Sequence, residues 1–240
     1  MTDVPTEPSA SEERRDVLKY TFLRLRPEWR HLPRETRDPA KESVTKLLEN
    51  PPAGVLLRTY SLVGTKAGPE MLLWVIAPAL EPVQELHSRL LGSALGAYLE
   101  TTHSYLGMAR RSEYLGDHVH ENQEGGTRRP LDRPYLFVYP FVKTRAWYGI
   151  PFADRQRVMG EHFRIGHKYP DVGIHTGYSF GLDDAEFILS FEADDPGRFL
   201  DLVRDLRPTE ASKYTELETP IFTCLAAPPR RMLDLADGLP

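Results

Sequence analysis

Cysteine is almost absent from this sequence, since Cys224 is the only one among 240 residues. A single thiol cannot form an intramolecular disulfide, and it has no second cysteine with which to share a zinc site or a redox pair. Disulfide scaffolds and dithiol oxidoreductases are therefore excluded. The cysteine usage fits a reducing compartment, and we expect a cytoplasmic protein.

Long hydrophobic runs are also missing. The longest apolar stretches, around 71–80 and 135–142, fall well short of the roughly 20 residues that a membrane-spanning helix requires. Residues 1–15 are polar and acidic with two prolines, without the apolar core of a secretory signal. We expect no membrane span and a disordered tail over 1–16.

The chain has no surplus of positive charge. It contains 30 Lys and Arg against 35 Asp and Glu, a formal net charge of −5. Nucleic-acid binding needs clustered cations that displace the counterions of the phosphates, so nucleic acid is not an expected partner. With 40% hydrophobic and 27% charged residues, the composition is that of an ordinary globular protein.

The periodicity of apolar residues in the first half predicts the order β-α-β-β-α-β. The expected elements are a strand at 20–25, a helix at 40–48, strands at 55–62 and 71–77, a helix at 82–99 and a strand at 104–114. In the second helix, apolar residues at three- and four-residue steps give one buried stripe. This order is the split βαβ pattern of a four-stranded antiparallel sheet with helices on one face.

The second half repeats the order. We expect a strand at 134–143, a helix at 152–169, strands at 172–180 and 186–192, a helix at 196–206 and a closing strand at 215–225. The predicted fold is therefore α+β, with two tandem ferredoxin-like units packed as a dimeric α+β barrel within one chain. The units span 17–116 and 134–227, joined by a linker loop at 117–133 and followed by an exposed basic tail at 228–240.

One histidine lies on the apolar stripe of the predicted helix 152–169. His162 falls among Val158, Met159, Ile165 and Gly166, so it should point inward. A histidine in this setting is more often a hydrogen-bonded core residue than a ligand. Neutral imidazole is, however, the usual proximal ligand of haem iron, and an apolar helix face suits that cofactor. Both interpretations remain open at this point.

The strand before that helix carries polar groups on an aromatic face. Its two-residue period places Tyr135, Phe137, Tyr139, Phe141 and Lys143 on one side. Such aromatic stripes usually form core, but the hydroxyl of a buried tyrosine and the ammonium of a buried lysine need partners. For the lysine, a carboxylate such as a porphyrin propionate would serve.

These motifs resemble a known family. The run Tyr139-Pro-Phe-Val-Lys143, then Trp147-Tyr148, Pro151, Asp154-Arg155 and Met159-Gly-Glu-His162, is similar to the core of the chlorite dismutase family. The likeness is greatest to its actinobacterial coproheme decarboxylases, which show a comparable series at the same spacing. Further agreement comes from 169–172, 187–194, Leu206-Arg207 and 220–223.

The resemblance implies roles for individual residues. His162 would be the proximal iron ligand, Tyr139 the redox-active tyrosine, and Lys143 the basic residue that holds a propionate, with Trp147 and Arg207 also binding the cofactor. In those enzymes hydrogen peroxide oxidises the iron porphyrin, a tyrosyl radical forms, and two propionates of coproheme lose CO2 to become the vinyl groups of haem b.

On the distal side, the resemblance implies that His118 is a catalytic acid–base group. His120 and His175 compete with it for that role. Chlorite-splitting members have an arginine where this chain has Ile174, next to His175, and a glutamate where it has Ala211. Ile174 and His175 are therefore expected to line the cofactor, and chlorite is not the expected substrate.

Some positions depart from the decarboxylase pattern. Phe163 replaces a glycine after the proximal histidine, and Gly173 and Ser212 stand in place of arginines, which would weaken the grip on four propionates. Haem b in a binding, trafficking or peroxidase-type role is therefore an alternative to coproheme, and a cofactor-free barrel is a third. The implied partners are an iron porphyrin, hydrogen peroxide and further copies of the chain, as in the homopentamers of the family.

Overall fold

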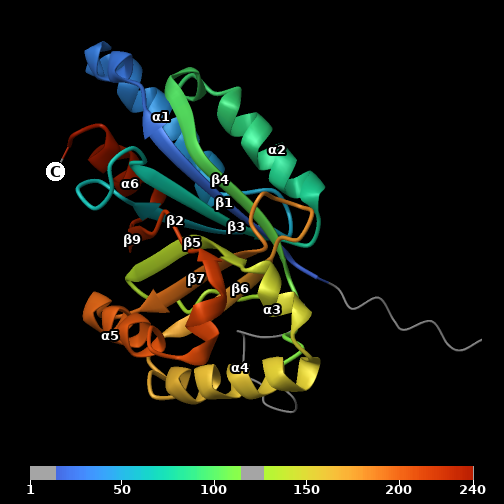
Figure 1. Cartoon of the computed structure of the whole chain (residues 1–240). Coiled ribbons are helices and arrows are strands. Elements are labelled where there is room, and N and C mark those ends of the chain that lie inside the picture. The colour runs from blue at the N-terminus through green and yellow to red at the C-terminus, as the bar shows by residue number, and fades with distance from the viewer. Residues whose placement is uncertain (1–14, 115–126, 240) are drawn as a thin grey trace, which may run out of the picture.

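The computed structural model describes residues 15–114 and 127–239 (Figure 1). The first half folds in the predicted order. Its elements are β1 (Val17–Leu25), α1 (Arg34–Glu49), β2 (Leu56–Ser61), β3 (Met71–Ala77), α2 (Leu80–Leu91) and β4 (Leu99–Ala109). Short 3-10 turns, η1 (Pro27–His31) and η2 (Gly96–Tyr98), follow β1 and precede β4.

The second half contains the same series with additions. Its elements are β5 (Tyr135–Lys143), α3 (Arg145–Gly149), α4 (Phe152–Gly166), β6 (Gly173–Tyr178), β7 (Phe187–Ala193), α5 (Pro196–Leu206), η3 (Glu210–Tyr214), β8 (Thr215–Leu217), β9 (Phe222–Ala226) and α6 (Pro229–Ala236).

Eight of the described strands form a closed antiparallel ring. The first unit has the order β4-β1-β3-β2 and the second β6-β7-β5-β9, each the order of a ferredoxin-like sheet. The units meet where β4 pairs with β6 and where β2 pairs with β9, while β8 adds to the end of β5 outside the ring. The predicted α+β barrel of two ferredoxin-like units is confirmed.

Side chains from both units fill the interior of the barrel. Alternation along each strand turns every second residue inward. The inward cluster includes Leu18, Tyr20, Phe22, Leu72, Trp74, Leu136, Val138, Ile188, Phe222 and Cys224. Because strands of both halves contribute, neither sheet buries this face without the other.

Helices cover the outer faces of the two sheets (Figure 1). On the first unit, α1, α2 and α6 pack over outward residues such as Leu23, Leu73 and Val75. On the second unit, α4 and α5 lie along the opposite side of the molecule, and α5 packs Phe199 and Leu202 onto the sheet. The outer face of the second sheet is the one that carries Tyr139.

The expected tail at 228–240 is wrong, because residues Pro229–Ala236 form α6. Met232, Leu233 and Ala236 are buried against α1 and β2. The fully buried ammonium of Lys41 donates to Asp234 at 2.7 Å and to Asp237 at 2.9 Å. The prolines and arginines at the start of this short amphipathic helix resemble an exposed terminus in the sequence, and the Lys41 partner of its aspartates lies almost 200 residues away.

Two predicted boundaries also differ. The helix expected over 82–99 ends at Leu91 and the following strand begins at Leu99 rather than 104. At Gly96, a Cβ atom would lie 2.4 Å from the carbonyl oxygens of Leu90 and Leu91, so glycine lets the chain fold back closely there. The closing strand expected over 215–225 is divided into β8 and β9, with Pro220 between them.

Some predictions fall on residues outside the described ranges. These are the disorder of residues 1–14 and the roles of His118 and His120, which lie within 115–126. In the ranges that the structure does describe, no helix is both long and apolar enough to cross a membrane.

Candidate functional site

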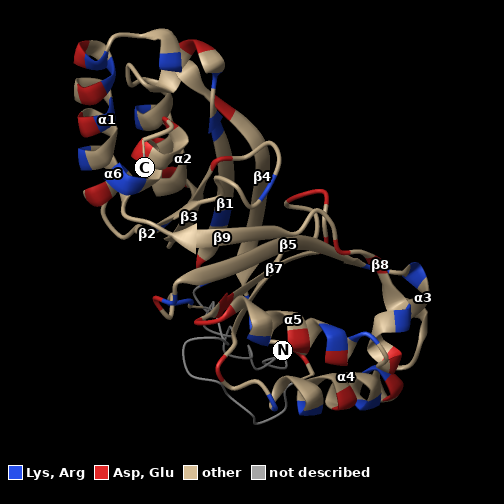
Figure 2. Ribbon diagram, turned by 90° about the vertical axis from the view of Figure 1, so that its left-hand side faces the viewer, with Lys and Arg blue, Asp and Glu red and all other residues tan. Residues whose placement is uncertain are grey.

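The outer face of the second sheet is unevenly covered. Phe137 and Tyr139 on β5 are buried, as is Phe191 on β7. Further along the same face, Phe141, Ile174, Thr176, Tyr178, Phe187 and Leu189 are only partly buried. Helices α4 and α5 run along this side (Figure 2), yet solvent still reaches part of the face. An apolar, partly open surface opposite a helix is suited to a planar apolar ligand.

His162 lies in the middle of α4, on the stripe that includes the buried residues Val158 and Ile165. Burial, and secondarily the nearby Lys143 ammonium, lower the pKa of His162 to about 4. The imidazole is therefore neutral at physiological pH. Among the described residues, none forms a hydrogen bond with its ring nitrogens, so the ring can offer a lone pair to a metal.

Lys143 ends β5 and points to the same outer face as Tyr139. Its ammonium donates to the carbonyl oxygen of Ala211 at 3.1 Å and lies 4.7 Å from the centre of the Trp147 ring. Burial lowers the pKa of Lys143 to about 8, against an opposing effect of the Glu186 carboxylate. The structure thus places Lys143, Trp147 and His162 in one neighbourhood.

A small hydrophobic cluster supports this neighbourhood. Trp147 from α3, Val158 from α4 and Ala211 from η3 are buried together, with Met159 and Tyr214 packed against them. The cluster fixes the first half of α4 on α3 and η3. Since His162 follows Val158 by one helical turn, the cluster also sets where the imidazole lies.

Tyr139 lies in the middle of β5, on the same outer face as Lys143. Its ring stacks on Phe191 with centroids 5.8 Å apart and planes 11° apart. Burial, and to a lesser extent the Glu218 carboxylate, raise the pKa of the Tyr139 phenol, while Arg207 opposes them. Arg207 forms an ion pair with Glu218. Tyr139 and Arg207 are thus brought together, and the raised pKa keeps the phenol protonated at neutral pH.

Ile174 and His175 lie on opposite faces of β6. Ile174 faces outward and packs against the cluster that contains Tyr139. His175 faces the barrel interior, is fully buried, donates or accepts a hydrogen bond with Glu192 at 2.7 Å, and lies 5.2 Å from the Trp74 ring. The expectation that both residues line one cofactor is wrong, because successive residues of a strand point to opposite sides. Ile174 remains in the proposed site.

The space at Gly173 is occupied. A Cβ atom at this position would lie 2.2 Å from the Cδ1 atom of Leu131. Leu131 belongs to the segment that crosses from the first unit to the second, and its amide donates to the buried carboxylate of Glu192 at 2.7 Å. A larger residue at position 173 would therefore require the Leu131 side chain to move.

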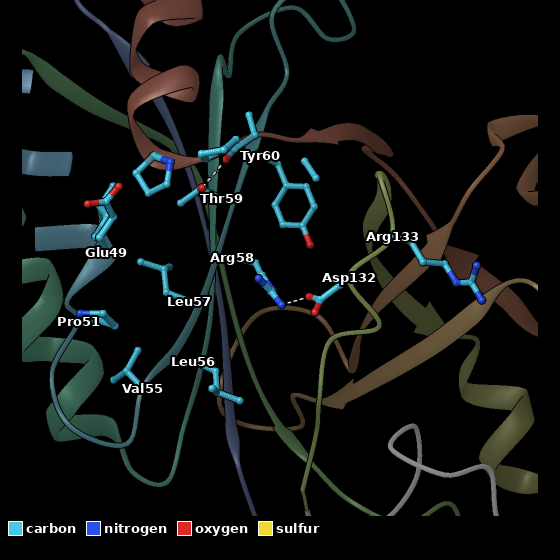
Figure 3. Close-up of a pocket in the computed structure, with 15 residues that line it drawn as sticks. Glu49, Pro51, Val55, Leu56, Leu57, Arg58, Thr59, Tyr60, Asp132 and Arg133 are labelled. Atoms are coloured by element: carbon cyan, nitrogen blue, oxygen red, sulfur yellow. Dashed lines mark hydrogen bonds and ion pairs between the residues drawn. The ribbon is translucent and has the colours of Figure 1, made fainter. Parts of the chain in front are cut away.

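A separate hollow of about 530 Å³ lies between β2, the segment 132–133 and the start of α6 (Figure 3). An ion pair between Arg58 and Asp132 crosses it. None of the residues predicted to bind a cofactor lines this hollow. It is therefore distinct from the site on α4.

Two carboxylates near the site were not predicted from the sequence. Glu218 pairs with Arg207, and Glu186 accepts hydrogen bonds from the Lys143 amide and the Tyr148 hydroxyl. The contacts of Glu186 depend on the pairing of β5 with β7, whereas Glu218 follows β8 and lies 11 residues from Arg207, which follows α5. No local pattern marks either residue.

Comparisons with known proteins identify the family and the fold. A coproheme decarboxylase from Mycolicibacterium smegmatis is 35% identical over 188 residues, covering 78% of this chain and 80% of the relative. A chlorite dismutase variant from Candidatus Nitrospira defluvii superposes with a TM-score of 0.84 at 24% identity, covering 95% of this chain and 97% of that chain. A haem-binding protein from Thermus thermophilus superposes with a TM-score of 0.81 at 25% identity, covering 99% and 100%. The chlorite dismutase family model matches residues 26–227, and the chain belongs to that family.

Proposed function

We propose that this protein binds an iron porphyrin through His162 and converts coproheme to haem b in a reaction driven by hydrogen peroxide. One observation carries the proposal: a neutral imidazole without a hydrogen-bond partner in the described residues lies opposite a partly open apolar face. The relative from Mycolicibacterium smegmatis, which is named a coproheme decarboxylase, supports the choice of reaction.

The residues present fit such a group. A neutral histidine suits iron, and the aromatic and aliphatic side chains of β5, β6 and β7 suit the faces of a porphyrin. His162 would hold the iron, Ile174 and Phe141 would contact the macrocycle, and Lys143, Trp147 and Arg207 would lie around its edge. When bound, the iron porphyrin supplies the oxidising chemistry with peroxide.

Tyr139 is suited to give up an electron together with a proton. Because burial keeps the phenol protonated, oxidation of the ring must release the proton from Oη as well. Stacking on Phe191 holds the ring in one orientation. In the overall reaction each propionate, one hydrogen peroxide molecule and one proton give a vinyl group, CO2 and two water molecules.

The test is to load the protein with coproheme, add peroxide and follow the porphyrin by mass spectrometry. The wild type should lose one CO2 and two hydrogens at each of two propionates, and Tyr139→Phe should lose most of this conversion. Tyr135→Phe, on the same face of the same strand, is the matched control and should convert as the wild type does. Equal conversion by Tyr139→Phe would remove the tyrosine from the reaction.

A second candidate is haem binding without turnover. It is favoured by the pairing of the cations near the site, since Lys143 donates to Ala211 and Arg207 is paired with Glu218. Fewer free cations favour a porphyrin with two carboxylates over one with four. Haem b bound more tightly than coproheme, with no change in porphyrin mass after peroxide, would select this candidate.

A further inference from the structure

Glu186 is a buried carboxylate that the proposed reaction does not use. It directly precedes β7 and is 8% exposed. Its Oε2 atom accepts a hydrogen bond from the backbone N–H of Lys143 at 2.8 Å and another from the Tyr148 hydroxyl at 2.6 Å. The Arg145 guanidinium lies 3.6 Å from Oε1, but its side chain is 90% exposed, so that ion pair contributes little.

The Lys143 amide needs this acceptor because it lies beyond the end of the β5–β7 ladder. Pairing between β5 and β7 ends at Phe141 and Phe187, and the pairing of β5 with β8 shifts register between Val142 and Lys143. A buried N–H without an acceptor is costly. The Glu186 carboxylate therefore continues the ladder with a side chain, and its charge strengthens both hydrogen bonds.

The two partners of Glu186 enclose a short segment of the chain. Lys143 ends β5 and Tyr148 belongs to α3, with Trp147 between them. One carboxylate thus fixes both ends of the segment 143–148 to β7. That segment carries the Lys143 ammonium, which helps to lower the pKa of His162, and the Trp147 indole ring, which this ammonium contacts.

We propose that Glu186 is a positioning residue of the iron-porphyrin site, which acts by holding Lys143 and Trp147 in place beside His162. This inference rests on the proposed function of His162. Glu186 itself touches neither the iron nor the porphyrin. Its influence passes through the backbone of Lys143 and the packing of Trp147 against Val158 on α4.

The experiment compares Glu186→Ala, Glu186→Gln and Tyr148→Phe in the full chain. Glu186→Ala removes both hydrogen bonds, while the amide oxygen of Gln can still accept from Lys143. Tyr148→Phe keeps the carboxylate and its bond to Lys143 and removes only the second bond, so it separates the contributions of the two hydrogen bonds. The measurements are the haem dissociation constant, the iron–histidine stretching frequency of the ferrous haem complex, and amide hydrogen exchange at Lys143 in the haem-free protein.

We expect Glu186→Ala to weaken haem binding roughly tenfold, the usual effect of removing a group that orients a metal ligand. The stretching frequency should shift and exchange at Lys143 should accelerate. Glu186→Gln should recover most of the affinity, and Tyr148→Phe, which frees only one end of the segment, should change the affinity and the stretching frequency less than Glu186→Ala does and leave exchange at Lys143 near that of the wild type. If Glu186→Ala does not fold, a Gln variant that exchanges faster at Lys143 and shifts the stretching frequency still supports the inference.

Unchanged affinity and stretching frequency in Glu186→Ala would overturn the inference while leaving the proposed function intact, provided that His162→Ala abolishes binding. If instead His162→Ala binds haem as the wild type does, the proposed function itself fails. The two failures are therefore distinguishable.

Discussion

Two histidines of this chain show that the surroundings of a side chain decide its role. His162 is neutral, partly exposed and without a hydrogen-bond partner in the described ranges, whereas His175 is fully buried and bonded to Glu192. Their intrinsic chemistry is the same. Their surroundings make the first available to a ligand and the second a structural member of the barrel interior.

His175→Ala should therefore affect stability and leave the cofactor site unchanged. The substitution leaves the Glu192 carboxylate without its imidazole partner, although the Leu131 amide still donates to it. We expect the free energy of unfolding to fall by roughly 1–3 kcal/mol, the cost of an unsatisfied buried group. Urea unfolding measures this loss, and the spectrum of the haem complex should match that of the wild type.

The contrasting substitution is His162→Ala. Because the His162 side chain is partly exposed, its removal should change the free energy of unfolding little. A His175→Ala protein that folds as stably as the wild type but loses its haem spectrum would contradict the orientation of β6.

At the level of the elements, α6 is held to α1 by a buried charge cluster. Lys41 bonds with Asp234 and Asp237, and Arg37 and Arg230 pair with the same two carboxylates. Burial alone would raise the pKa of Asp234, but hydrogen bonds from Lys41 and Arg230 outweigh it and the pKa is lowered. The docking of the last helix therefore depends on pH.

The sign of this dependence follows from the lowered pKa. A carboxylate with a depressed folded pKa stabilises the fold above its unfolded pKa of about 4, and this contribution is lost as pH falls through the folded pKa. Lys41→Met removes the buried cation that the two carboxylates share and leaves Asp237 paired with Arg37 and Asp234 with Arg230. We expect this loss to cost roughly 1–3 kcal/mol at neutral pH. We expect the difference in unfolding free energy between wild type and variant to shrink on acidification below about pH 4.

Lys46→Met provides the control on the same helix. Lys46 is exposed and 3.4 Å from Glu42, so its removal should change stability by less than about 1 kcal/mol at any pH. Equal effects of the two substitutions would show that α6 is not held by Lys41.

In the whole molecule, the two units share one interior and are joined by two short strand pairings, β4 with β6 and β2 with β9. We call each of these pairings a seam. At one seam, β4 and β6 pair only through Met108 with Tyr178 and Ala109 with Gly177. A Cβ atom at Gly107 would lie 2.9 Å from Ser179 Oγ and 3.3 Å from the backbone of Gly177. The seam therefore requires small residues for close approach of the strands.

Gly107→Ala should consequently destabilise the protein by about 1–3 kcal/mol, since the extra methyl group must push the seam apart. Gly160→Ala is the comparison, because open space surrounds that position on α4 and alanine favours a helix by about 0.5–1 kcal/mol. Thermal unfolding of both variants measures the effects. A stabilising Gly107→Ala substitution would contradict the close packing of the two units.

The repeated strand and helix order could be predicted from sequence because it depends on local periodicity. The two-residue period of β6 could also have separated Ile174 from His175. Other features could not be predicted, because they depend on contacts between distant residues. Lys41 lies 193 residues from Asp234, and Glu186 lies 43 residues from Lys143. Each pair meets only in the folded protein.

The most direct test of the account is haem titration of the wild type, His162→Ala and His167→Ala, followed through the Soret band. His167 directly follows α4, is exposed, and serves as the control. The account predicts one haem per chain for the wild type and His167→Ala, and binding at least about tenfold weaker with an altered Soret band for His162→Ala. If His162→Ala shows the affinity and spectrum of the wild type, His162 is not the iron ligand.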